Sequence, residues 1–114
     1  LASFEITQRK LSSLAAEAGL LDAKPFSEAA LAEARASGKP VFVWFTADWC
    51  LTCKVNESAA IERVATRDAF REAGVIALRG DWTRRDEEIT RFLTAQGAAG
   101  VPLYLWYPAG SGPA

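Results

Sequence analysis

Residues 41–53 decide the fold, and they read Val-Phe-Val-Trp-Phe-Thr-Ala-Asp-Trp-Cys-Leu-Thr-Cys. The five residues 41–45 are large and apolar without alternation, which predicts a strand buried on both faces, as in the middle of a parallel sheet. Cys50 and Cys53 follow after a short turn. The stretch from Cys50 to about Val64 contains no Gly or Pro, so we expect a helix that begins at the first cysteine.

Further helices and strands alternate on both sides of this unit. The pattern predicts a helix capped by Ser27 and ended by Gly38, a strand at 75–78, a helix at 83–96 capped by Thr83, and a strand at 103–107. A short helical turn is expected at 68–73. This alternation favours an α/β domain with at least two parallel strands.

Composition limits the possible classes of protein. The chain has 114 residues, of which 50% are hydrophobic and 24% charged, as expected of one globular domain. Its net charge of −1 offers no general attraction for nucleic acid or an acidic membrane surface, so no nucleic-acid partner is expected. No apolar run reaches the ~18 residues of a membrane span. Because the chain begins with Leu1 instead of Met, we expect it to be part of a longer protein.

The cysteine and histidine content narrows the chemistry to one pair of thiols. The chain has two cysteines and no histidine, which excludes Ser-His-Asp and Cys-His hydrolases. A closed zinc site needs about four ligands, mainly Cys and His, and would require a second chain. We therefore expect no metal and no dissociable cofactor. The remaining candidate is the Cys50-Leu51-Thr52-Cys53 motif.

Cys50 is placed to act as a nucleophile. A thiolate is the attacking species in disulfide exchange, and an ordinary cysteine with a pKa of ~8.5 is mostly protonated at neutral pH. A position at the start of a helix lowers the pKa of a thiol, because unpaired backbone N–H groups stabilise the negative charge. Cys53 lies one turn later, where it can resolve a mixed disulfide formed on Cys50.

Glu57 is the candidate catalytic carboxylate. On a helix it shares a face with Cys50 and Cys53, where it could relay the proton of Cys53 and raise the thiol pKa values by like-charge repulsion. The alternative is a solvated residue, or an ion pair with Arg63 or Lys54.

Three other residues are candidates for docking a substrate. Trp49 would shield the thiols and offer a flat contact surface, unless it packs into the core, whereas Asp48 is expected to be a turn or cap residue. Pro102 directly precedes a predicted strand and cannot donate a hydrogen bond to it. A cis Val101–Pro102 bond would leave the Val101 backbone free to pair with an extended substrate.

Other readings of the cysteine pair remain open. The two thiols could form a structural disulfide or hold Cu(I) in a copper-binding module, although the chain lacks the methionines that copper carriers often add. The domain could also be an inactive adaptor that uses the fold only for docking. Exchange against a small disulfide, Cu(I) binding and a Cys50→Ala variant would separate these cases.

The chain resembles thioredoxin, and more closely the C-terminal thioredoxin-like domain of the DsbD family of thiol:disulfide interchange proteins, including its ScsB-type relatives. The resemblance covers about residues 25–110. It is carried by three stretches: Phe-Thr-Ala-Asp-Trp-Cys-Leu-Thr-Cys-Lys-Val-Asn-Glu at 45–57, Gly-Asp-Trp-Thr at 80–83, and Gly-Val-Pro-Leu-Tyr at 100–104.

This resemblance implies a thioredoxin-like α/β fold with a central mixed sheet flanked by helices at 25–114, after a linker or leader at 1–24 from a membrane domain. It implies a protein-disulfide reductase with a redox-active Cys50–Cys53 disulfide, Pro102 as a cis-proline, and Glu57 at an acidic position of the family. The domain would lie in the periplasm as part of an inner-membrane protein. Its partners would be the transmembrane electron carrier of the same protein and periplasmic thioredoxin-like or other disulfide-bearing proteins.

Two departures from the family pattern carry their own expectations. Thioredoxins commonly have a buried Asp six residues before the first cysteine, where this chain has Trp44, so Glu57 carries more of the expected proton transfer. The family fold also closes with a strand and a helix that a chain ending at Ala114 would lack. An open sheet edge predicts lower stability or pairing with another chain.

Overall fold

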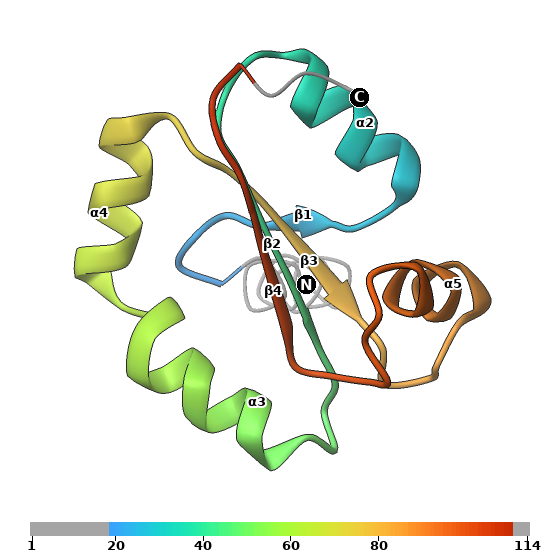
Figure 1. The fold of residues 1–114 in the computed structure, drawn as a ribbon. Helices are drawn as coiled ribbons and strands as arrows, with labels where there is room; N and C mark the ends of the chain where they lie inside the picture. Colours follow the sequence, from blue (N-terminus) through green and yellow to red (C-terminus); the bar gives the residue numbers. More distant parts are fainter. Residues whose placement is uncertain (1–18, 111–114) are drawn as a thin grey trace, which may run out of the picture.

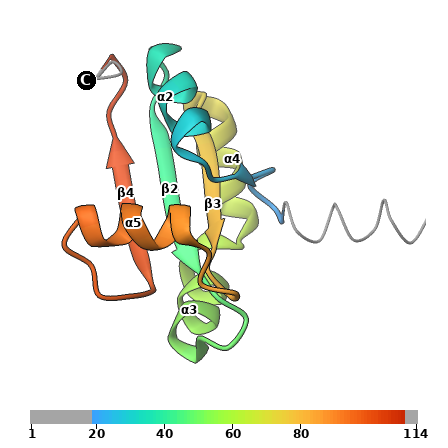
Figure 2. The ribbon, with the colours of Figure 1, turned by 90° about the vertical axis from the view of Figure 1, so that its right-hand side faces the viewer.

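The computed structural model describes residues 19–110, which form a mixed four-stranded sheet in the order β1-β3-β2-β4. The strands are β1 (Lys24–Pro25), β2 (Val41–Thr46), β3 (Ile76–Asp81) and β4 (Leu103–Tyr107). β3 runs parallel to both β1 and β2, whereas β4 pairs antiparallel with β2. Figure 2 shows β4, β2 and β3 side by side. The predicted parallel pairing is confirmed.

Helices cover both faces of this sheet, as Figure 1 shows with the sheet nearly edge-on. One face carries α2 (Glu28–Ala36) and α5 (Glu87–Ala95). The other face carries α3 (Leu51–Asn56), its π-helical continuation η1 (Glu57–Ile61) and α4 (Val64–Ala73). The expected α/β architecture, a mixed sheet flanked by helices, is confirmed.

The predicted central position of β2 is also confirmed. Val41, Val43 and Phe45 are completely buried in the core under α2 and α5. Trp44 points to the opposite face and packs with Ile61 of η1. Because β2 has a neighbour along each edge and helices on both faces, water reaches none of these four side chains.

Two predicted helices have different boundaries in the structure. The helix expected from Cys50 to about 64 leaves α-geometry at η1, and extended backbone at Arg63 then separates it from α4. The helical turn expected at 68–73 is present but is part of a longer helix, because α4 already begins at Val64 and runs for 10 residues. The Thr66 hydroxyl donates a 2.6 Å hydrogen bond to the Ala60 carbonyl oxygen across this break.

The predicted cap Thr83 is wrong. α5 begins at Glu87, and its N-cap is Asp86, whose carboxylate accepts a hydrogen bond from the Ile89 backbone N–H. Thr83 instead lies in the turn after β3, where its hydroxyl bonds to Asp81. The predicted cap Ser27 is confirmed, because its hydroxyl accepts from the Ala30 N–H at the start of α2.

The segment before β1 contacts the domain where the structure describes it. The Leu20 backbone N–H donates a 2.8 Å hydrogen bond to Glu62, and Ala23 is buried beside Trp44. Residues 1–18 lie outside the described part of the chain, so the linker expected at 1–24 stays a prediction.

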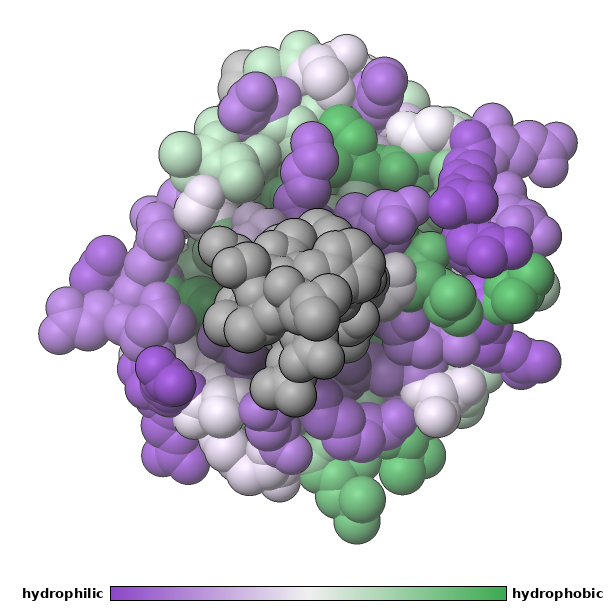
Figure 3. All heavy atoms as spheres, turned by 180° about the vertical axis from the view of Figure 1, so that it is seen from behind, coloured by the Kyte–Doolittle hydropathy of each residue, from purple (hydrophilic) through white to green (hydrophobic). Residues whose placement is uncertain are grey.

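β4 is an edge strand within residues 19–110, and Tyr104 and Trp106 are exposed on it. Among residues 19–110 no further strand pairs with β4, and lower stability or pairing with another chain remains a prediction. Seen from behind, the surface is mostly hydrophilic, and its hydrophobic side chains form separate patches (Figure 3). Among the described helices, none has the length and apolar character needed to cross a bilayer.

Candidate active site

Cys50 and Cys53 form a disulfide at the start of α3, with their Cα atoms 5.3 Å apart. Cys50 is the N-cap residue of this helix, and its Sγ accepts a 3.2 Å hydrogen bond from the Cys53 backbone N–H. In the reduced protein the same N–H would face a thiolate, which is the form that reacts. The predicted placement of the pair at a helix start is confirmed.

The two cysteine residues differ in exposure, although both are buried. Cys50 keeps 8% of its surface exposed and Cys53 only 1%, within a small apolar cluster that also contains Ala47 and Val101. Cys50 is therefore the more exposed residue of the pair, and Cys53 is almost fully enclosed. This asymmetry matches the predicted order of attack, with Cys50 as nucleophile and Cys53 as resolving thiol.

The Val101–Pro102 peptide bond is cis, as the resemblance implies. Val101 packs on the cysteine cluster, and β4 begins at Leu103, directly after Pro102. The structure thus brings together the two sequence segments that carry the expected chemistry and docking. Substrate docking at Val101 and Pro102 stays a prediction.

Glu57 is buried at the first position of η1, with 8% of its surface exposed. Its Oε2 accepts a 2.7 Å hydrogen bond from the Thr46 hydroxyl, and its Oε1 lies 3.8 Å from the Lys54 ammonium. The solvated alternative is therefore wrong, and the ion pair forms with Lys54. Arg63 instead donates to the Ala59 carbonyl oxygen.

Trp49 is half exposed, at 50%, so core packing of this side chain is wrong. Its indole Nε1 donates a 3.0 Å hydrogen bond to the Thr83 carbonyl oxygen. The Thr83 hydroxyl in turn accepts from the Asp48 backbone N–H at 2.9 Å. These bonds tie the turn after β3 to the two residues that precede Cys50.

Asp81, the last residue of β3, has a carboxyl group with a shifted pKa. Burial acts to raise its pKa, but hydrogen bonds from the Thr83 hydroxyl and backbone N–H, with the charges of Arg79 and Lys54, outweigh it and lower the pKa below the ordinary 3.8. The ionised Asp81 therefore helps to hold Thr83, and through it the cysteine loop.

Sequence reasoning missed three parts of the site: Thr46 beneath Glu57, Thr83 as the anchor of the cysteine loop, and a contact of Arg85 with Trp49 and Trp82. The Gly-Asp-Trp-Thr motif at 80–83 includes Thr83, but no spacing within the sequence predicts that the turn containing Thr83 contacts the cysteine loop. Thr46 directly follows the strand predicted at 41–45, and a polar residue at that position was the only indication in the sequence of a buried hydrogen bond.

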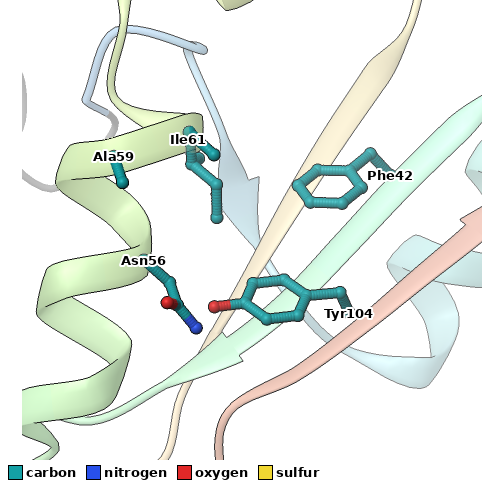
Figure 4. Close-up of a pocket in the computed structure, with 6 residues that line it drawn as sticks. Phe42, Asn56, Ala59, Ile61 and Tyr104 are labelled. Atoms are coloured by element: carbon teal, nitrogen blue, oxygen red, sulfur yellow. The ribbon is translucent and has the colours of Figure 1, made fainter.

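An apolar groove of about 310 Å³ lies on the same face of the sheet as η1. Its lining residues are Phe42, Asn56, Ala59, Ala60, Ile61 and Tyr104. Figure 4 shows the Asn56 side chain and the Tyr104 hydroxyl turned toward each other at one end. Neither cysteine lines this groove, so it is separate from the disulfide. Within residues 19–110 no group of three or more Cys, His, Asp or Glu is placed to hold a metal ion.

A mixed sheet of this topology, with a Cys-x-x-Cys disulfide at a helix start beside a cis-proline, defines a thiol–disulfide oxidoreductase of the thioredoxin class. The family model described as Thioredoxin-like matches residues 22–109. The chain belongs to the thioredoxin-like family.

Individual relatives agree with this assignment. The thiol:disulfide interchange protein DsbD 1 of Pseudomonas aeruginosa is 38% identical over 86 residues, which are 73% of this chain and 14% of that protein. DsbD of Vibrio cholerae is 32% identical over 82 residues, 72% of this chain and 13% of that protein. The chain thus spans about one seventh of the curated relatives it matches.

Solved structures show the same likeness in three dimensions. The oxidised C-terminal domain of Neisseria meningitidis DsbD aligns with a TM-score of 0.58 and 26% identity, covering 75% of this chain and 78% of that one. Trxlp from Edwardsiella tarda aligns with a TM-score of 0.54 and 25% identity, covering 77% and 78%. The resemblance to DsbD seen in the sequence is therefore confirmed.

Proposed function

We propose that this domain is a periplasmic protein-disulfide reductase that passes electrons from a transmembrane domain of the same protein to disulfide-bearing partners. One observation carries the proposal: the Cys50–Cys53 disulfide lies at the start of α3, and Cys50 is the more exposed residue of the pair. The likeness to DsbD proteins supports the location and the membrane partner.

The reaction is a dithiol–disulfide exchange that transfers two electrons. The Cys50 thiolate attacks one sulfur of the partner disulfide, a mixed disulfide forms, and the second partner sulfur leaves as a thiolate that takes up a proton. Cys53 then loses its proton and attacks the sulfur of Cys50. The partner is released as a dithiol, and the Cys50–Cys53 disulfide is left to be reduced by the membrane domain.

Glu57 is the group we assign to the second step. Its carboxylate is buried at the helix position four residues after Cys53 and is oriented by Thr46. In this position it accepts the proton that Cys53 must lose before attack, directly or through one water molecule. The negative charge of the Glu57 carboxylate is balanced in part by the Lys54 ammonium, which lies 3.8 Å from Oε1 of Glu57.

Docking is assigned to the surface around Cys50, the more exposed cysteine. Trp49 is half exposed on one side of Cys50, and Val101 packs against the pair with the cis-proline behind it. An extended segment of the partner would lie against the Val101 backbone while its disulfide meets Cys50.

The proposal is tested with the dithiol form of the protein and a synthetic peptide closed by one disulfide. We expect stoichiometric reduction of the peptide, loss of the reaction in Cys50→Ala, and a trapped mixed disulfide on Cys50 in Cys53→Ala. A reduction potential well below that of periplasmic oxidases would support a reductase, and a high potential would point to an oxidase or isomerase.

Two results would contradict the proposal. Tight stoichiometric Cu(I) binding together with no exchange against the peptide would favour a copper-binding module. Unchanged partner capture by Cys50→Ala, again without exchange, would favour an adaptor.

A further inference from the structure

The guanidinium group of Arg85 lies against two indole rings, one of which belongs to Trp49, the residue before Cys50. Its central carbon is 5.0 Å from the ring centroid of Trp49 and 5.3 Å from that of Trp82. The two ring centroids are themselves 6.0 Å apart. A cation over the faces of aromatic rings is attracted by their quadrupoles, so both indoles hold the Arg85 side chain in place.

The backbone fixes the same position. Arg85 has φ 50°, in the left-handed region that side chains other than glycine rarely adopt. Its N–H donates a 2.9 Å hydrogen bond to the Trp82 carbonyl oxygen, and the next residue, Asp86, caps α5. The side chain is therefore presented from a turn that is bonded at both ends.

The guanidinium has no carboxylate of its own in the part of the chain that the structure describes. No ion pair or side-chain hydrogen bond of Arg85 occurs within residues 19–110. Nearby acids have other partners: Asp81 accepts from Thr83, Asp86 accepts from the Ile89 N–H, and Asp48 lies 3.9 Å from Lys54. The N–H groups of Arg85, an exposed residue, are thus open to an incoming group.

The position of the Arg85 guanidinium allows it to contact a partner protein during disulfide exchange. Trp49, which it contacts, directly precedes Cys50. Thr83, two residues before Arg85, is hydrogen-bonded to Asp48 and Trp49, so Arg85 belongs to the turn that is tied to the cysteine loop. An immobilised guanidinium matches a carboxylate better than any other protein group, because two N–H donors meet two oxygens.

We propose that Arg85 is a specificity-determining residue, which binds a carboxylate next to the disulfide of the partner protein. This inference rests on the proposed function, since it concerns the partner that the disulfide reacts with. The partner it selects carries Asp or Glu beside its disulfide, and Trp49 and Trp82 hold the guanidinium in the orientation that receives it.

The test uses two synthetic peptides that each contain one disulfide and differ only in Glu or Gln beside a half-cystine. We expect the dithiol protein to reduce the Glu peptide about two- to fivefold faster at low salt, as for a partly exposed ion pair, and the preference to fade at high salt. Arg85→Gln should bring the ratio of the two rates to near one, and Arg85→Lys should keep part of it. Arg84→Gln is the matched control, because it removes a neighbouring charge that makes no cation–π contact within residues 19–110, and it should keep the preference.

Each outcome has a distinct meaning. A wild-type ratio near one, or a preference that Arg85→Gln leaves intact, overturns the inference while exchange itself stands. An equal loss of preference in Arg84→Gln also overturns it, since the effect would then belong to the general charge of the turn. If Arg85 had only a structural role, Arg85→Gln would slow the reduction of both peptides equally and leave the ratio of the two rates unchanged. Failure of the wild-type protein to reduce either peptide would contradict the proposed function and this inference with it.

Discussion

The hydroxyl of Thr46 donates a 2.7 Å hydrogen bond to Oε2 of Glu57, and both side chains are buried. Thr46 is the last residue of β2 and Glu57 the first of η1, so the bond joins the central strand to the helix that carries the cysteines. With Trp44 at the strand position where thioredoxins commonly place an acid, the buried carboxylate of this site comes from the helix instead.

Replacement of this carboxylate should slow the release of the mixed disulfide. Glu57→Gln keeps an oxygen that can accept from Thr46, so the fold should persist, while the proton acceptor for Cys53 is lost. We expect the second step of exchange to slow by roughly 10–100-fold, which rapid acid quenching would show as accumulated mixed disulfide. Glu72→Gln, which changes an exposed carboxylate on α4, is the control and should not alter the rate. An unchanged lifetime of the mixed disulfide in Glu57→Gln would remove Glu57 from the mechanism.

Loss of the Thr83 hydroxyl should loosen the loop before Cys50. Thr83→Val preserves the shape of the side chain but leaves the Asp48 N–H without its acceptor and removes a donor to Asp81. Since these groups are partly solvated, we expect a loss of about 0.5–1 kcal/mol in the free energy of unfolding, measured with urea. Thr94→Val removes a hydroxyl that donates only to the carbonyl oxygen one turn earlier and should cost less. Equal effects of the two substitutions would deny Thr83 a special role.

The lowered pKa of Asp81 predicts how stability depends on pH. Because its folded pKa is below the ordinary 3.8, the stabilisation from ionised Asp81 is fully present above about that pH and is lost as the pH falls through the lower folded value. Asp81→Asn lacks this contribution at every pH. The difference in unfolding free energy between wild type and Asp81→Asn should therefore be constant from pH 7 to about 5 and shrink below about pH 4. A difference that grows on acidification would contradict the prediction.

Gly80 is required by close packing against β2. A Cβ atom there would overlap Cδ1 of Phe45 and lie 2.6 Å from its Cε1. The Phe45 ring is completely buried, with Phe26 at 4.9 Å and Phe92 at 5.4 Å between ring centroids, so it has little room to move. Gly80→Ala should cost about 1–3 kcal/mol in the free energy of unfolding.

Gly100→Ala is the matched control for Gly80→Ala. Its Cβ would lie 3.5 Å from Cζ3 of Trp82, an ordinary van der Waals contact. Urea unfolding should place this variant close to the wild type, and a similar loss in both alanine variants would mean that Phe45 is not the cause.

Elements with strong local signals were predictable from the sequence. The unbroken apolar run of β2 requires burial on both faces, and Ser27 caps α2 through a contact with a residue only three positions away. The boundaries near η1 and α5 were not predictable in the same way. The end of α3 depends on a break stabilised across Ala60 and Thr66, and Thr83 has partners far away in the chain that compete with a capping role.

The candidate site also has features that the sequence predicts and features that depend on tertiary contacts. The spacing of Cys50 and Cys53 predicts that both lie in one turn of helix, and the structure shows them joined as the disulfide that the family resemblance implies. The environment of Glu57 does not follow from spacing, because its partner Thr46 belongs to a strand that reaches it only when the sheet and helix pack together. The same holds for Arg85, whose indole partner Trp49 comes from the loop before α3.

By itself, the sequence determined the chemistry of this protein: one thiol pair at the start of a helix after a buried strand, in a chain without histidine. Those features depend on residue type and on spacings within a single turn, which local geometry alone sets. Only the tertiary structure decided which carboxylate is buried, which cysteine is the more exposed and which cation lies against Trp49. These properties arise from contacts between segments distant in the chain, and burial and charge pairing exist only once those segments meet.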